Sequence, residues 1–207
     1  MAKLIGISGS IGSGKDTAAD YLCNFHGFKR DSFASTLKDA ISNIFGWNRE
    51  WLEGRTKTSR EWREKVDEWW AARLNIPHLT PRWVLQNWGT EVCRLGFHDD
   101  IWIASLENKL RQTDEDIVIS DVRFPNEIKS IEKQGGIMVR VKRGPEPDWF
   151  SLAIDANKGD ENAKERLKSL NVHASEYSWV GTNFTTIIEN DGTIQDLYDK
   201  VESLLTK

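Results

Sequence analysis

A glycine-rich segment near the start of the chain, Gly9-Ser10-Ile11-Gly12-Ser13-Gly14-Lys15-Asp16-Thr17, constrains the fold more than any other feature of the sequence. It follows the short apolar run Lys3–Ser8, and Ala18, Leu22 and Phe25 come after it at helical spacing. We therefore expect a strand, a tight turn and a helix in succession. Glycines let consecutive backbone N–H groups turn inward around phosphate oxygens, and the N-terminus of the following helix faces the same anion. The segment predicts a nucleotide-phosphate site formed by Ser10, Gly12, Ser13, Gly14, Lys15, Asp16 and Thr17.

The residue after Lys15 departs from the usual phosphate-loop pattern, which has Ser or Thr there to bind magnesium. In this chain the position is Asp16, and Thr17 follows it. We expect Lys15 to neutralise the β- and γ-phosphates. Asp16 could contact Mg²⁺ through water, act near an acceptor phosphate, or only complement the helix dipole, and the spacing leaves these alternatives open. Asp16, Thr17 and Asp121 are the metal-binding candidates, and Asp121 could equally serve only a turn at the end of its strand.

Size, charge and cysteine content narrow the class of protein. A chain of 207 residues and 23.7 kDa can bury the core of one α/β domain without disulfides. The net charge of −4 disfavours nucleic-acid binding as the main activity. Cys23 and Cys93 lack metal-ligand spacing, which fits a reducing cytoplasm. Apolar runs such as Ile117–Ile119 are far shorter than the roughly 20 residues that span a bilayer, and we read the N-terminus as mature chain, so we expect a soluble cytoplasmic protein.

Strands alternate with helices along the chain, which predicts an α/β fold with three layers, α/β/α, around a parallel sheet of about five strands. We expect one domain over residues 1–207. Its core would comprise residues 1–47, 112–143 and 185–207, with a helical substrate-binding insertion at 48–111 and a lid at 144–184.

Several local predictions concern the insertion and the lid. Apolar spacing predicts a single helix over Ser59–Leu74, and Thr80-Pro81 begins a helix that we expect to continue to about Leu95. Residues 144–160 contain Gly and Pro breaks and are expected to be a mobile excursion. The ten tryptophans are expected mainly to anchor packing.

Cationic residues are expected to hold a second, anionic substrate. Ligands collect beyond the carboxyl ends of parallel strands, so Gly9, Phe33 and Asp121 should converge on one edge. Lys38 and Arg123 follow strands there, and Arg82 lies on a polar helix face shared with Gln86 and Thr90. A phosphomonoester dianion needs such charge neutralisation, and a guanidinium can bind two of its oxygens.

Taken together, these motifs resemble those of the bacteriophage deoxynucleoside monophosphate kinases, within the P-loop nucleoside monophosphate kinase superfamily. The resemblance rests on Ser13–Thr17, Leu37–Ala40, Arg82–Glu91, Asp100–Trp102, Asp121–Arg123 with Glu127, His173–Glu176 and Asn190–Gly192. It implies that ATP and a dNMP are converted to ADP and a dNDP with Mg²⁺. The Asp after Lys15 is itself a trait of this family.

The resemblance also assigns roles to residues. Catalysis would involve Lys15, Asp16, Asp121 and Arg123. The acceptor nucleotide would contact Lys38, Arg60, Arg63, Arg82, Gln86, Thr90, Trp102, Arg123 and Glu127. The lid would contribute Arg143, His173, Ser175 and Glu176. The expected partner is a small-molecule substrate, with no nucleic acid or membrane; a homodimer is left open, and the compartment is the host cytoplasm if a phage encodes the chain.

Two other functions are compatible with the sequence. One is a kinase for another phosphorylated metabolite, such as phosphomevalonate or dephospho-coenzyme A. The other is a nucleotide-dependent switch, which would hydrolyse ATP slowly and would leave the arginines beyond the loop unexplained.

Overall fold

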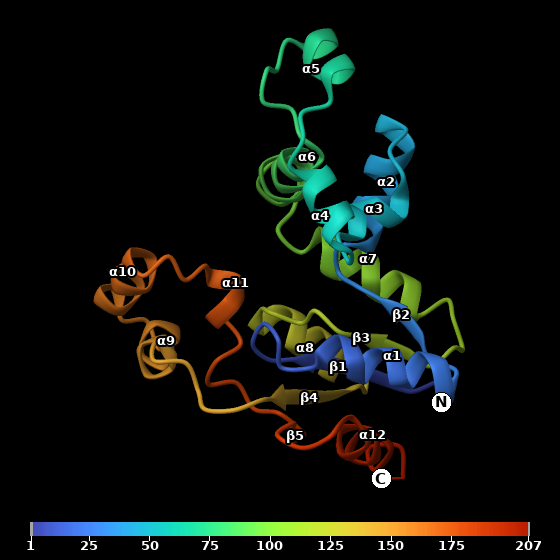
Figure 1. Cartoon of the computed structure of the whole chain (residues 1–207), viewed down its shortest axis with the longest axis vertical. Helices are drawn as coiled ribbons and strands as arrows, with labels where there is room; N and C mark the ends of the chain where they lie inside the picture. Colours follow the sequence, from blue (N-terminus) through green and yellow to red (C-terminus); the bar gives the residue numbers. More distant parts are fainter. Residues whose placement is uncertain (1, 207) are drawn as a thin grey trace. The chain divides into compact units, whose positions relative to one another are not determined.

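The computed structural model describes residues 2–206, which form two compact units (Figure 1). The first, which we call the sheet unit, comprises residues 2–32 and 110–206. The second, the helical unit, comprises residues 33–109. Each unit is described by itself below.

The sheet unit is built on five parallel strands in the order β2-β3-β1-β4-β5. Their bounds are Leu4–Ser8 (β1), Lys29–Asp31 (β2), Ile117–Ile119 (β3), Ile137–Lys142 (β4) and Thr186–Glu189 (β5). Strand β1 is central, and the chain builds the sheet first on one side of it and then on the other. The carboxyl end of β1 is therefore a topological switch point, where open α/β sheets bind their ligands.

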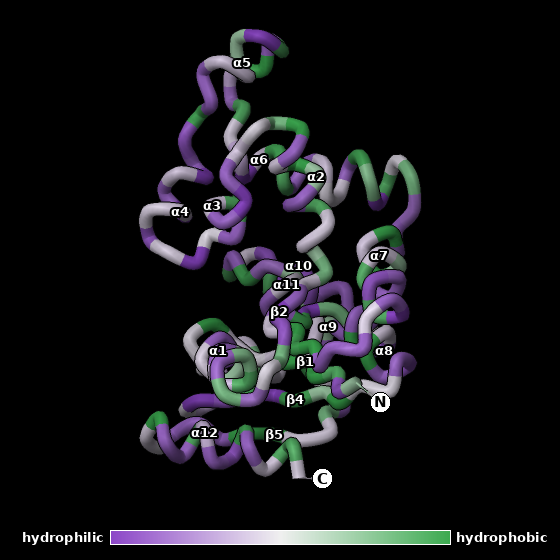
Figure 2. Tube along the Cα trace, turned by 90° about the vertical axis from the view of Figure 1, so that its right-hand side faces the viewer, coloured by the Kyte–Doolittle hydropathy of each residue, from purple (hydrophilic) through white to green (hydrophobic). Residues whose placement is uncertain are grey.

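Helices cover both faces of this sheet. On one face, α1 (Lys15–His26) and α12 (Ile194–Glu202) bury Leu22 and Leu197 against a core that includes Ile7 and Val139. On the other face lies α8 (Pro125–Lys133), whose Ile131 packs so close to Gly6 that a side chain there would collide with it. Strand β1 is coloured as hydrophobic in Figure 2, whereas β2 is hydrophilic and α12 alternates between hydrophobic and hydrophilic residues. The predicted three-layer α/β/α fold with a five-stranded parallel sheet is confirmed.

The segment between β4 and β5 is more ordered in secondary structure than the sequence indicates. It contains α9 (Phe150–Asn157), α10 (Glu161–Ser169) and α11 (Ala174–Tyr177). Helix α9 lies within residues 144–160, which were expected to be a mobile excursion, and buries Ala153 and Ala156. Small side chains allow α9 to pack closely against α10, an interaction that the Gly and Pro residues around it conceal in the sequence.

Arg140 of β4 joins the base of this segment to the sheet. Its guanidinium is buried, lies 2.6 Å from the Glu146 carboxylate, and has its Cζ 5.1 Å from the ring centre of Phe150 and 4.8 Å from that of Trp179. A guanidinium over aromatic rings is stabilised by their electron-rich faces. Arg140 is thus a structural residue and not an exposed lid cation.

The helical unit consists of short helices around an aromatic core. Their bounds are Ser35–Phe45 (α2), Arg49–Glu53 (α3), Lys57–Arg63 (α4), Glu68–Leu74 (α5), Pro81–Gln86 (α6), Asn87–Leu95 (η1) and Ile101–Leu110 (α7, whose last residue belongs to the sheet unit). The rings of Phe45 and Trp47 stack with their centres 4.4 Å apart, and Trp70 and Trp88 pack around Phe45. Most tryptophans anchor packing as expected, but Trp69 is 63% exposed.

The prediction of one helix over Ser59–Leu74 was wrong, because the chain breaks between Arg63 and Glu68. Asp67 causes the break: its carboxylate accepts a hydrogen bond from the Trp70 backbone N–H at 3.1 Å and so begins a new helix. It also accepts one from the Trp47 indole at 2.7 Å. The apolar residues whose spacing predicted one helix therefore lie on two separate helices, α4 and α5.

The helix predicted from Pro81 to about Leu95 is present over that range, but its winding changes within it. The α-helix ends at Gln86, and η1 is a π-helix, a form that is often found at functional sites. Its Gly89 carbonyl accepts a hydrogen bond at 2.9 Å from the buried indole of Trp102. Glycine and β-branched residues weaken the local α-helical preference, so tertiary packing determines the winding. Leu95 is 71% exposed and does not continue the predicted apolar face.

Across residues 2–206, no helix has the length and apolar character that crossing a membrane would require.

Candidate active site

The glycine-rich loop lies at the carboxyl end of β1 and leads directly into α1. Gly9 and Gly14 have φ angles of 138° and 104°, which favour glycine. Close neighbours reinforce this requirement: a Cβ on Gly9 would collide with the Val141 carbonyl of β4, and one on Gly14 with the Asn190 side chain. The loop is therefore fixed between β4 and the turn after β5, at the switch point of the sheet.

Asn190 supports the loop from the opposite end of the sequence. It is 9% exposed, and its side-chain amide donates a hydrogen bond to the Ser13 carbonyl at 2.8 Å. This hydrogen bond restrains the backbone of the loop at Ser13. The sequence marks Asn190–Gly192 only as a turn, and nothing local could have identified this contact.

A backbone carbonyl of the loop holds the Lys15 amine in place. Its Nζ donates to the Ser10 carbonyl at 2.7 Å. Burial and then the nearby charge of Arg123 lower the pKa of Lys15 from its ordinary value, while Asp16 and Asp121 act in the opposite direction. A partly desolvated ammonium beside a second cation is electrostatically suited to a polyanion such as a nucleotide phosphate.

Asp16 lies on the exposed side of α1, where it pairs with a cation of its own unit. Its side chain is 81% exposed, and its carboxylate is 3.3 Å from the Arg30 guanidinium of β2, which also pairs with Asp20. The exposed carboxylate can accept further partners beside Arg30, because it has two oxygens. Thr17 follows it in the first turn of α1 and lines a cavity beside the loop.

A first cavity gathers residues from the loop, the end of β3 and the α9–α11 segment. It is lined by Gly9, Ser10, Ile11, Lys15, Val122, Arg123, Trp149, Ser175, Glu176 and Trp179. Arg123 lies 3.5 Å from the Ser175 hydroxyl, and within residues 2–206 no carboxylate forms an ion pair with it. The structure thus brings together the expected residues Lys15, Arg123, Ser175 and Glu176. Sequence reasoning missed Trp149 and Trp179 there.

Glu127 and His173 act on the residues beside this cavity. The buried Glu127 carboxylate accepts from the backbone N–H groups of Arg123, at 2.9 Å, and Phe124, at 3.1 Å. His173 is the N-cap of α11, and its Nδ1 accepts from the Ser175 backbone N–H at 3.2 Å. Glu127 therefore fixes the backbone that carries Arg123, and His173 the one that carries Ser175.

A second cavity of about 350 Å³ adjoins the N-terminus of α1. Its lining combines Gly12, Gly14, Lys15, Asp16, Thr17, Arg143, Asn190, Gly192, Ile194 and Leu197. The lining offers backbone groups, the charged side chains of Lys15, Asp16 and Arg143, and aliphatic side chains at Ile194 and Leu197, an arrangement that suits a nucleotide whose phosphates lie in the loop. Of these residues, Asn190, Gly192, Ile194 and Leu197 are missed by the sequence analysis.

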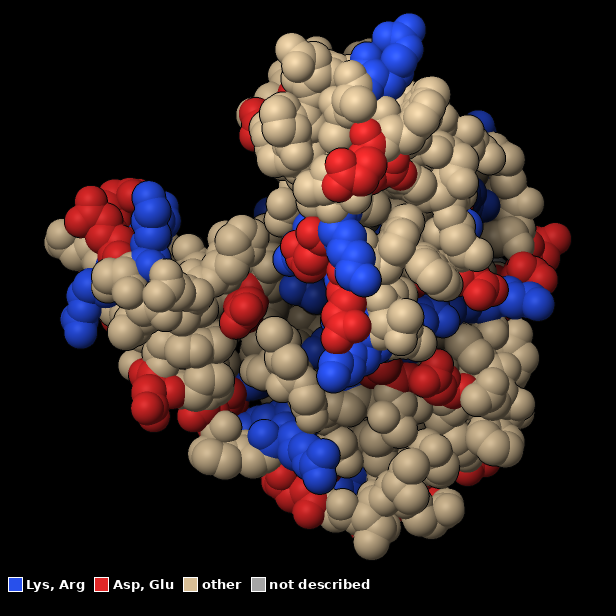
Figure 3. All heavy atoms as spheres, turned by 45° about the horizontal axis from the view of Figure 1, so that its top comes forward, with Lys and Arg blue, Asp and Glu red and all other residues tan. Residues whose placement is uncertain are grey.

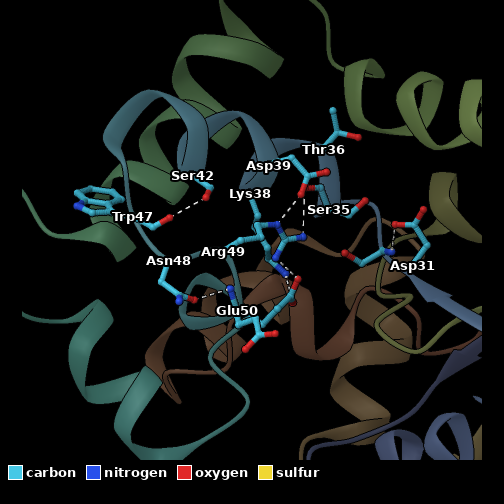
Figure 4. A network of polar contacts seen from close by, with 12 residues as sticks. Asp31, Ser35, Thr36, Lys38, Asp39, Ser42, Trp47, Asn48, Arg49 and Glu50 are labelled. Atoms are coloured by element: carbon cyan, nitrogen blue, oxygen red, sulfur yellow. Dashed lines mark hydrogen bonds and ion pairs between the residues drawn. The ribbon is translucent and has the colours of Figure 1, made fainter. Parts of the chain in front are cut away.

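In the helical unit, Lys38 is committed to an ion-pair network. Its Nζ lies 2.6 Å from the Glu53 carboxylate, which also accepts from Arg49 at 2.5 Å. Arg49 in turn contacts Asp39 (Figure 4). Burial alone would raise the pKa of Glu53, but Lys38 and Arg49 outweigh it and hold that pKa below its ordinary value. This network ties α3 to α2.

Unlike Lys38, Arg63 is half-buried and forms no ion pair with a carboxylate among residues 2–206. Its Nη1 donates to the Leu52 carbonyl at 3.3 Å, and its Nε is buried with no hydrogen-bond partner among residues 2–206. Burial and then the charge of Arg82 lower the pKa of the Arg63 guanidinium. Arg82 pairs with Glu64 at 3.3 Å, both side chains being about half exposed, and Arg60 donates to the Arg55 carbonyl at 3.5 Å. These positive charges favour an anion.

The other expected acceptor residues are placed differently from one another. Gln86 and Thr90 are exposed, the first at the end of α6 and the second in η1. Trp102 is 9% exposed and donates its indole N–H to η1, so its direct effect is on the shape of that helix. Basic and acidic side chains are interspersed on the face drawn in Figure 3, in keeping with the net charge of −4.

Comparison with known proteins places the chain in a family. No protein-family model matches it. It is 30% identical over 214 residues, 97% of this chain and 94% of the relative, to an Acanthamoeba polyphaga mimivirus protein provisionally named a deoxynucleotide monophosphate kinase. It is 30% identical over 176 residues, 61% of this chain and 70% of the relative, to the deoxynucleoside-5'-monophosphate kinase of Escherichia phage T5.

Solved structures align over almost the whole chain, though at low similarity. Dephospho-CoA kinase from Campylobacter jejuni is 15% identical with a TM-score of 0.43, covering 99% of this chain and 96% of that one. Shikimate kinase from Acinetobacter baumannii is 17% identical with a TM-score of 0.43, covering 100% and 94%. These two carry no argument about substrate. The similarity to the two sequence relatives, in contrast, shows that the chain belongs to the deoxynucleoside monophosphate kinase family.

Proposed function

We propose that the protein is a kinase that transfers the γ-phosphoryl group of ATP to a deoxynucleoside 5'-monophosphate. The activity is that of the family, and the loop around Lys15 supplies the donor side. An oxygen of the dNMP phosphate attacks the γ-phosphorus, the bond from that phosphorus to the β–γ bridging oxygen breaks, and ADP and dNDP result. Phosphoryl transfer requires mainly alignment, charge neutralisation and exclusion of water from the protein.

The observation that carries the acceptor half of this proposal is the state of Arg63. A half-buried guanidinium with an unpartnered Nε and no carboxylate ion pair among residues 2–206 is costly unless an anion joins it. A monophosphate dianion is the ligand whose charge and oxygens satisfy that group. A nucleotide-dependent switch would not need it.

On the donor side, the loop amides and Lys15 would bind the β- and γ-phosphates, and the cavity beside Thr17, Arg143 and Asn190 would accept the nucleoside of ATP. Arg123 would neutralise charge that develops on the transferred group. Ser175 and Glu176, beside Arg123, would help to exclude water.

Mg²⁺ fits this donor set as a substrate-borne ion. Residues 2–206 contain no group of three or more His, Cys, Asp or Glu side chains able to hold a metal by themselves. Mg²⁺ usually keeps several waters and binds through substrate phosphates and one or two protein carboxylates. Asp121, Thr17 and Asp16 are the residues proposed to hold it, and the Asp16 side chain is 81% exposed beside Arg30. The ion would neutralise phosphate charge.

On the acceptor side, Arg63 and Arg82 would bind the phosphate, with Arg60, Gln86 and Thr90 as further candidates. The Arg82–Glu64 pair is about half exposed, and such pairs contribute little, so a phosphate can replace Glu64 at small cost. Lys38 would act through Glu53, to which it is bound.

The direct test is incubation of the protein with ATP, Mg²⁺ and a panel of acceptors: the four dNMPs, the ribonucleoside monophosphates, dephospho-coenzyme A and phosphomevalonate. We expect ADP formation that depends on a dNMP. ADP formation with none of the dNMPs, or only with another metabolite, would refute the proposal. Slow hydrolysis that ignores every acceptor would indicate a switch.

Replacing Arg82 by alanine should weaken use of the dNMP and leave ATP binding intact. Loss of a charge-assisted hydrogen bond to phosphate is expected to raise the KM for dNMP about 10- to 100-fold. Steady-state kinetics with each substrate varied in turn measure this. The control is Arg73→Ala, at an exposed arginine in the last turn of α5. Unchanged KM and kcat for dNMP in Arg82→Ala would remove Arg82 from the acceptor site.

A further inference from the structure

Gly54 lies at the point where Arg63 meets the end of α3. It is the C-cap of that helix, with a φ angle of 68°, and it is buried. A Cβ on Gly54 would collide with the Cζ and Nη2 atoms of Arg63 and would lie 2.8 Å from its Nε. The guanidinium thus occupies the volume in which any other residue would place its side chain.

The two segments that meet there are each fixed independently. In α3, Asn48 caps the first turn by accepting from the Glu50 and Trp51 backbone N–H groups at 2.9 and 3.1 Å. Leu52 is fully buried, and Glu53 is held by two cations. The end of α3 therefore has little freedom to move away from Arg63.

Helix α4, which carries Arg63 as its last residue, begins with a capping box. The Thr56 hydroxyl accepts from the Ser59 backbone N–H at 3.1 Å, and the Ser59 hydroxyl accepts from the Thr56 backbone N–H at 3.1 Å. Two satisfied N–H groups set where the helix starts, and so where Arg63 emerges. Both sides of the Gly54–Arg63 contact are thus preorganised.

We propose that Gly54 is a positioning residue for the acceptor substrate: its missing side chain provides the seat that orients the Arg63 guanidinium toward the phosphate of the dNMP. This rests on the acceptor role proposed above for Arg63. With Nη1 bound to the Leu52 carbonyl and the Cζ–Nη2 edge against Gly54, the guanidinium plane is fixed, and Nε is buried without a hydrogen-bond partner among residues 2–206. A preoriented guanidinium loses less freedom when it binds phosphate.

The chain offers a closely matched control for backbone strain. Gly46 is the C-cap of α2 in the same unit, with φ 69° against 68° for Gly54. A Cβ on Gly46 would meet nothing within 4 Å. Alanine therefore imposes the same left-handed strain at both positions, but only at Gly54 does it also displace a guanidinium.

The test compares Gly54→Ala with Gly46→Ala. We expect Gly54→Ala to lower kcat/KM for dNMP about 10- to 100-fold, because a displacement of about 1 Å in a binding group can cost about 10²-fold. The KM for ATP should stay the same, and Gly46→Ala should retain the wild-type kcat/KM for dNMP. Equal values for the two variants would overturn the proposal.

A double variant keeps the test valid if Gly54→Ala destabilises the fold. In Gly54→Ala/Arg63→Ala the collision is removed, so the melting temperature should return to that expected from strain alone, as in Gly46→Ala. Its kcat/KM for dNMP should equal that of Arg63→Ala. Additive effects would overturn the proposal. If the wild type phosphorylates no dNMP, the proposed function fails; the melting temperatures still report whether Gly54 seats Arg63.

Discussion

Replacing Lys15 by methionine is expected to lower kcat by on the order of 10³-fold, the cost of removing one preorganised donor at the transferred group. The Lys15 amine lies within the loop, 2.7 Å from the Ser10 carbonyl, in the cavity that also holds Arg123. Burial lowers the pKa of Lys15, so the charged amine is disfavoured by its surroundings in the folded protein. The melting temperature should therefore stay the same or rise, which separates lost catalysis from lost stability.

The matched control for Lys15→Met is Lys164→Met. Lys164 lies on α10 and pairs at 2.7 Å with Glu161, outside both cavities that adjoin the loop. It should retain the wild-type kcat. The measurement is ADP formation at saturating ATP and dNMP, with calorimetry for the melting temperature. A Lys15→Met enzyme with near-normal kcat would contradict the placement of the triphosphate in the loop.

The second large effect is expected from Arg123→Ala, which should lower kcat about 10²- to 10³-fold with a smaller change in the KM for ATP. Arg123 follows β3 at the switch point of the sheet, and Glu127 holds its backbone N–H at 2.9 Å. The charge of Arg123 is one cause of the lowered pKa of Lys15. Removing Arg123 should raise the pKa of Lys15, which favours the charged amine. A lower kcat in Arg123→Ala therefore reflects the loss of the guanidinium and not a loss of charge on Lys15.

Arg123→Lys distinguishes charge from geometry. A lysine keeps the positive charge but loses the planar, forked set of donors, so an intermediate kcat is expected. Both variants should fold normally, because Arg123 is exposed and, among residues 2–206, its side chain forms one hydrogen bond, a 3.5 Å contact with Ser175. If Arg123→Ala turned over at the wild-type rate, Arg123 would have no part in transfer.

The sequence predicted best the features that depend on neighbouring residues. The apolar spacing over Ser35–Phe45 and the Gly46 stop predict a helix there, and α2 has these bounds, because both signals are local. Strand β5 was predicted equally well. The break at Asp67 and the π-helix η1 were missed because the Trp47 and Trp102 indoles, distant in sequence, contact the backbone or side chains there.

The same distinction between local signals and distant contacts applies to the residues of the candidate site. Sequence pattern predicted the loop with Lys15 from its motif and Arg123 from its charge and its place after a strand, whereas Arg63 was predicted only from the family resemblance. It could not identify Gly54, since a glycine after a short helix looks like any other helix stop, as Gly46 does.

By itself, then, the sequence determined the phosphate loop, the parallel α/β class and the family. These follow from contiguous residues whose backbone preferences and spacing act locally. Only the tertiary structure decided that Asn190 supports Ser13, that Trp149 and Trp179 line the cavity of Lys15, and that Arg63 lies against Gly54. Close packing creates such contacts between segments whose separation along the chain carries no signal of their meeting.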